Sequence, residues 1–119
     1  MPASSAHIAE AQKFETVLAT LQGTQHYGWV LVLWFYIVLH YVEAVLQAKM
    51  PRRRNHEIRR QDMLRIPETT AILPDYKTLE NLSREARYEC TPFIPSDLTV
   101  YEPVYLNVRT TMRRALGLP

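Results

Sequence analysis

The sequence is poor in glycine and cysteine. Its 119 residues include three glycines and one cysteine. So few glycines argue against a turn-rich β fold and favour helices. The single cysteine, Cys90, excludes a disulfide within the chain and a cysteine-rich zinc site. It also suits a reducing compartment, where thiols stay free.

The first residues lack the basic segment and the adjoining apolar segment of a signal peptide, so we expect a cytoplasmic protein. The length fits a single domain, residues 1–119. With 47% hydrophobic and 22% charged residues, the chain has the composition of a globular protein. The net charge is only +2, but six arginines fall between Arg52 and Arg65. The basic charge is therefore local.

Apolar residues recur at helical spacing in four long segments. These segments predict helices over residues 6–22, 25–49 and 74–89, and a last helix that begins with the capping pattern Thr99–Glu102 and ends at Gly117. Asn55 is a good N-cap for a short helix over residues 56–65, which Pro67 would end. We therefore predict an all-α fold, an antiparallel four-helix bundle with one additional short helix.

The segment Trp29–Leu46 is long and apolar enough to cross a membrane, and Arg52–Arg54 resemble a cytoplasmic anchor. Glu43 and His40 lie inside this segment, where a charge is costly in lipid. The other predicted helices are amphipathic and need an apolar partner. We therefore favour a buried core helix and keep a single span over residues 29–46 as the alternative.

A polar stripe runs along this apolar segment. Tyr36, His40 and Glu43 share one helix face, and polar groups in a core must be hydrogen-bonded. One interpretation is a ligand cleft or proton relay at a dimer seam. The other, which we favour, is a structural network in which Arg84 or Arg87 pairs with Glu43.

Three segments together resemble the HEPN domains, the "higher eukaryotes and prokaryotes nucleotide-binding" family. The aromatic run Trp34–Leu46 is similar to the family's core second helix. Arg54–Arg59 is similar to its histidine-bearing entry to the next helix, and Leu79–Tyr88 resembles its leucine-rich helix that ends in an arginine and a tyrosine. The resemblance covers about residues 30–90.

The resemblance implies a four-helix bundle that dimerises. Some HEPN domains are metal-independent ribonucleases or toxins, and others are inactive nucleotide- or RNA-binding partners. The active members carry Arg-x(4–6)-His near the dimer cleft. No histidine of this chain has an arginine at that spacing, which argues against ribonuclease activity.

His56, Arg59 and Arg60 fall on one helix face, where a histidine can exchange a proton and an arginine can hold a phosphate. The alternative is an ordinary solvated helix surface. Arg84, Arg87 and Tyr88 share another helix face, where they can bind a phosphate or stack on a base. The alternative is a helix surface on which Glu80 pairs with Arg84, with Tyr88 at the edge of the core. His40, Glu43 and His56 lack the tight spacing of a metal site, so we expect neither a metal nor a cofactor.

The leading hypothesis is nucleotide or RNA binding by a homodimer. The expected binding residues are Arg52, Arg53, Arg54, Arg59, Arg60, Arg84, Arg87 and Tyr88. The second hypothesis is a toxin-type ribonuclease with His56 or His40 as the acid–base group. The third is a non-catalytic bundle that binds a partner protein or a small apolar ligand.

Overall fold

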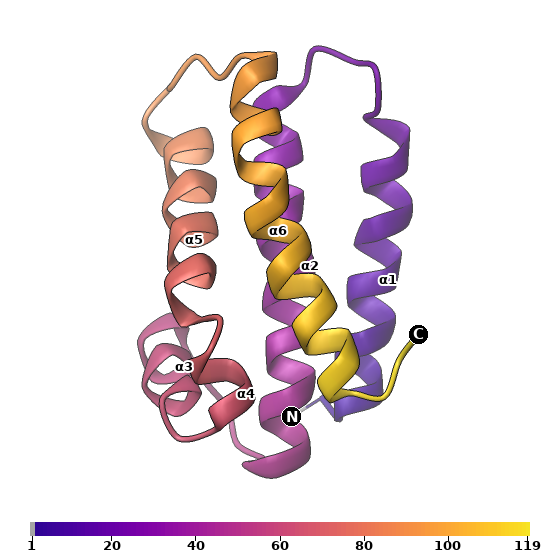
Figure 1. Cartoon of the computed structure of the whole chain (residues 1–119), viewed down its shortest axis with the longest axis vertical. Coiled ribbons are helices and arrows are strands. Elements are labelled where there is room, and N and C mark those ends of the chain that lie inside the picture. Colours follow the sequence, from indigo (N-terminus) through magenta and orange to yellow (C-terminus); the bar gives the residue numbers. More distant parts are fainter. Residues whose placement is uncertain (1) are drawn as a thin grey trace.

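A computed structural model describes residues 2–119, which form six helices and no strand (Figure 1). The all-α prediction is therefore confirmed. Four helices are long and two are short. The bounds are Ser4–Thr20 for α1, Tyr27–Lys49 for α2, His56–Met63 for α3, Pro67–Thr70 for α4, Leu73–Tyr88 for α5 and Pro95–Ala115 for α6.

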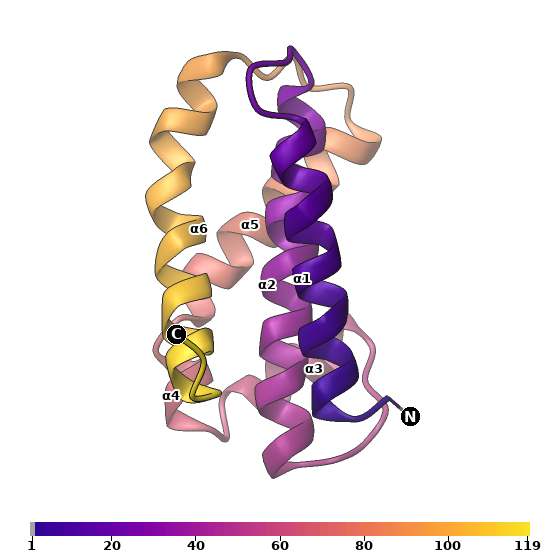
Figure 2. The ribbon, with the colours of Figure 1, turned by 90° about the vertical axis from the view of Figure 1, so that its right-hand side faces the viewer.

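The core is built around α2, which contacts α1, α5 and α6 (Figures 1 and 2). A helix that is apolar on every side must be covered on every side. The Trp34 ring stacks on Tyr105 of α6, with ring centroids 5.2 Å apart. The Phe35 ring meets Tyr76 of α5 at 5.5 Å. By length and composition α2 is able to span a membrane, but 78% of its most apolar stretch is buried within the protein.

The structure has two short helices where the sequence predicts one. Asn55 caps α3 as expected, because its side chain accepts a hydrogen bond of 2.7 Å from the Ile58 N–H. Pro67 does not end the helical region. It opens α4 instead, at a first-turn position where its missing N–H costs nothing.

The last helix begins earlier than the capping pattern at Thr99 predicts. Pro95 occupies the first turn of α6, and the Asp97 carboxylate accepts a hydrogen bond of 2.8 Å from the Ile94 N–H. A proline in the first turn followed by an acidic residue is a strong helix start, so it takes precedence over the later signal. Pro103 consequently lies inside α6.

The first helix begins at Ser4 rather than at residue 6, and its serines do not cap it. The Ser4 hydroxyl donates to the Ala44 carbonyl of α2 at 2.8 Å. Farther along, the Glu15 carboxylate receives hydrogen bonds from Tyr41 of α2 and from Arg109 of α6. These contacts tie α1 to both neighbours.

Candidate functional site

A cleft of about 340 Å³ lies where α2, α3 and α5 meet. It gathers predicted site residues from separate parts of the chain. Phe35 of α2 forms part of its wall. The other lining residues come from α3 (His56, Arg60) and α5 (Glu80, Arg84, Arg87, Tyr88). This meeting of α3 and α5 side chains was not predictable from spacing along the chain.

Glu80 is the carboxylate in this cleft. It accepts a hydrogen bond of 2.7 Å from Arg60 Nη1, and its second oxygen lies 3.4 Å from His56 Nδ1. The predicted surface pair between Glu80 and Arg84 is wrong, because Arg84 donates to the Asn81 side chain at 2.9 Å instead. One carboxylate thus faces three arginines, which leaves the cleft positively charged.

His56 lies at the mouth of the cleft, with half of its side chain exposed. Arg59 Nη1 lies 3.1 Å from its Nδ1. A guanidinium only donates, so Nδ1 can accept this hydrogen bond when the ring is neutral. Burial and then Arg59 lower the pKa of His56 below its usual 6.5. The imidazole is therefore neutral at pH 7.

Arg87 and Tyr88 form the aromatic side of the cleft. The Arg87 guanidinium donates to the Tyr36 hydroxyl at 2.8 Å and lies over both the Tyr36 and the Tyr88 rings. These contacts hold the guanidinium in place. Tyr88 itself is 69% exposed. The cleft therefore offers a fixed cation next to an open aromatic ring.

The remaining arginines of the basic run have other contacts. Arg52 and Arg54 both donate to Asp62, which is fully buried. Arg54 and Arg59 both donate to Glu43, at 3.2 and 2.9 Å. Arg53 is exposed on the other side of α3, beside His7 and His40. The arginines of residues 52–60 thus do not line one site: Arg60 lines the cleft, and Arg53, Arg54 and Arg59 line a separate pocket beside α1.

The polar stripe on α2 is also divided. Glu43 is buried and paired, as the structural interpretation requires, but its partners are Arg54 and Arg59. The predicted pairing with Arg84 or Arg87 is wrong, because the α2–α3 loop and α3 place Arg54 and Arg59 against Glu43 instead. Tyr36 accepts a hydrogen bond from Arg87 of the cleft but does not itself line it.

His40 faces α1 rather than the cleft. Its Nδ1 atom lies 3.0 Å from the Nδ1 atom of His7, and the two rings stack. His40 and His56 therefore belong to different surroundings and cannot act as one acid–base pair. Sequence reasoning missed His7, although its position on the apolar side of a helix was a usable signal. Within residues 2–119, no three His, Cys, Asp or Glu side chains come close enough to hold a metal ion.

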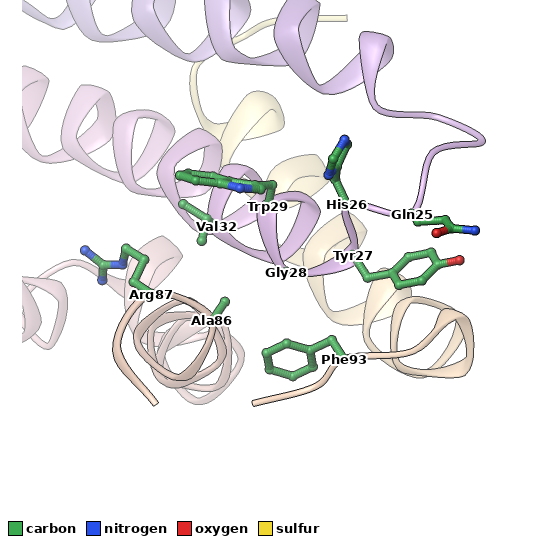
Figure 3. Close-up of a pocket in the computed structure, with 9 residues that line it drawn as sticks. All are labelled: Gln25, His26, Tyr27, Gly28, Trp29, Val32, Ala86, Arg87 and Phe93. Carbon is green, nitrogen blue, oxygen red and sulfur yellow. The ribbon is translucent and has the colours of Figure 1, made fainter. Parts of the chain in front are cut away.

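A second pocket, of about 390 Å³, lies at the other end of the groove between α2 and α5. Trp29 of α2 and Phe93 of the α5–α6 loop stand on either side of Gly28 and Ala86, and the Arg87 side chain lies at one end (Figure 3). Sequence reasoning missed this pocket. Trp29 begins the apolar segment that was predicted to be buried, but it is exposed. Phe93 comes from a loop, whose position the sequence does not indicate.

Comparison with known proteins found no matching family model, no matching curated protein and no matching solved structure.

Proposed function

We propose that this chain binds the phosphate and base of a nucleotide, or of single-stranded RNA, in the cleft between α3 and α5. The observation that carries the proposal is the meeting of Arg60, Arg84 and Arg87 with an exposed tyrosine around one cleft. The wider proposal is a HEPN-like domain whose four long helices form an antiparallel bundle. The homodimer expected from the resemblance stays a prediction.

Phosphate binding rests on the arginines. Among residues 2–119, the exposed Arg84 side chain has one hydrogen bond, to Asn81 of its own helix, so its remaining donors are available. Arg87 is already oriented by two aromatic rings and needs little ordering when a ligand arrives. Arginine is the side chain best suited to two-point binding of phosphate oxygens.

Base binding rests on Tyr88. Proteins that bind single strands stack unpaired bases on exposed aromatic side chains beside a positively charged path for the backbone. Tyr88 is the exposed ring, and the cluster Arg60, Arg84 and Arg87 is the charged path. Arg52, Arg54 and Arg59 instead neutralise the buried Asp62 and Glu43, so their role in this proposal is to hold α3 in position.

Binding of a short fluorescent single-stranded RNA tests the proposal, with anisotropy measured at low and moderate salt. Arg84→Ala should weaken binding about 5-fold, the loss expected for one exposed charge-assisted hydrogen bond. Two phosphate contacts predict a slope of about −1.4 for log K against log salt concentration. Arg65→Ala, which removes an exposed arginine elsewhere, is the matched control.

Equal affinity of the Arg84→Ala and Arg65→Ala variants would contradict the proposal. No RNA binding at low salt would contradict it as well, and it would favour the hypothesis of a protein-interaction bundle. RNA cleavage is measured in the same samples. Cleavage that is lost in His56→Ala would support the ribonuclease alternative.

A further inference from the structure

We infer that the pocket between Trp29 and Phe93 is a second base-binding subsite, so that the ligand is a single strand of at least two linked nucleotides. This inference rests on the proposed function, since it extends the cleft between α3 and α5. It also narrows the ligand class, because a free mononucleotide would leave the second subsite empty.

The two pockets are neighbours along one groove. Arg87 lines both of them, and α2 and α5 form the walls of both. The base-stacking ring of the cleft, Tyr88, and Trp29 of the second pocket are linked through Arg87, whose guanidinium lies 5.0 Å from the centre of the Tyr88 ring and whose side chain also lines the pocket beside Trp29. Arg87 then lies between the two base sites, where the linking phosphate would sit.

The pocket is suited to a flat aromatic ring. Trp29 is 62% exposed, an unusual state for the largest apolar side chain. Phe93 stands across from it (Figure 3). The floor of the pocket is formed by Gly28, which has no side chain, and by the small side chains of Val32 and Ala86 (Figure 3). His26 and Gln25 complete the lining at the N-terminal end of α2.

Charge decides among possible occupants. An apolar peptide side chain would fill the space between the rings but would leave the Arg87 guanidinium without an anionic partner at the end of the pocket. A base followed by a phosphate satisfies both features. Stacking on aromatic rings also accepts any base, so we expect little sequence preference at this subsite.

The test compares uridine monophosphate with the 5′-phosphorylated dinucleotide pUpU by calorimetry. The wild-type chain should bind pUpU about 10-fold more tightly, within the range found for one stacked base. Trp29→Ala should remove this advantage and leave the affinity for the mononucleotide unchanged. Leu64→Ala, which truncates another exposed apolar residue that lines neither pocket, should keep the advantage.

Gly28→Ala gives a second test that does not depend on removing a ring. A Cβ atom at Gly28 would lie 3.7 Å from the Ala86 Cβ, which is ordinary contact, and alanine is the better helix former, so the variant should fold. The added methyl raises the floor of the pocket and should lower the advantage of pUpU several-fold.

The outcomes separate the two proposals. If the mononucleotide binds and pUpU binds equally well, the proposal of a second subsite is wrong, and the proposal of nucleotide binding in the cleft is still supported. If pUpU keeps its advantage in Trp29→Ala, the second subsite is also wrong. If neither ligand binds at low salt, both proposals are wrong.

Discussion

At the scale of single residues, the carboxylate of Glu43 is buried and held by three hydrogen-bond donors. It is 4% exposed and receives hydrogen bonds from Arg59, Arg54 and Gln47. Transferring a charge out of water costs several kcal/mol, and only close donors offset that cost. Its partners Arg54 and Arg59 are equally buried, so the charges depend on one another.

We expect Glu43→Gln to lower the free energy of unfolding by about 3 kcal/mol, because it leaves two buried guanidinium groups with one fewer carboxylate. Urea unfolding measures this loss. Glu85→Gln removes an exposed carboxylate from α5 and should change stability by less than about 0.5 kcal/mol. A loss of the same size in both variants would mean that the network contributes nothing beyond surface charge.

The sequence correctly predicts that an arginine pairs with Glu43, but it names Arg84 or Arg87, and the partners are Arg54 and Arg59. Both α3 with the loop before it and α5 carry arginines that can approach Glu43. Pro51 follows the end of α2, and the turn after it places Arg54 and Arg59 against Glu43, so that no arginine of α5 pairs with it. That turn depends on the φ and ψ angles of a few loop residues, for which residue types give only a weak preference.

At the scale of elements, the contact between α1 and α2 is sensitive to pH. The facing Nδ1 atoms of His7 and His40 can share at most one proton. Burial lowers the pKa of both imidazoles. His7 lowers the pKa of His40 further. Glu43 and Glu10 raise the pKa of His7, and Arg59 and Arg54 lower it. The unfolded chain, whose histidines titrate near 6.5, therefore takes up protons before the folded chain does.

The free energy of unfolding should consequently be greatest above pH 6.5 and fall as the pH drops from 6.5 toward the lowered pKa values of the folded state. Urea unfolding at about pH 7.5 and about pH 5.5 brackets this range. His40→Gln should reduce the pH dependence, and His26→Gln, which replaces an exposed histidine, should not. Equal stability of the wild-type chain at both pH values would contradict the prediction.

The elements themselves were largely predictable, and their ends were not. Apolar periodicity located all four long helices, because a helix must turn one face to the core over many residues. The start of α6 depended on two competing signals only a few residues apart, and α4 is too short to show a period. The pocket beside Trp29 was also beyond prediction, since Phe93 reaches it from a loop.

At the scale of the whole molecule, α2 connects the fold to the proposed site. Its buried residues pack against three helices, and the same helix supplies one wall of the groove. The sequence indicated this core helix and each polar residue of the cleft. It could not place His56 and Arg60 beside Arg84 and Arg87, because that placement depends on how α3 packs against α5.

Phe35 belongs to both the core and the groove, so its truncation tests that connection. Phe35 is fully buried, its ring contacts Tyr76, Tyr36 and His56, and its edge lines the cleft. Phe35→Ala removes these contacts and leaves a cavity, so we expect a loss of about 3–5 kcal/mol in the free energy of unfolding by urea.

Val100→Ala, at a position 63% exposed on α6, should change stability by less than about 0.5 kcal/mol. A loss below about 1 kcal/mol in Phe35→Ala would mean that α3 and α5 collapse into the cavity without cost. The helices that line the groove would then rearrange easily. A large loss instead means that the core holds the groove open, which is the condition for a site that needs little reorganisation when a strand binds.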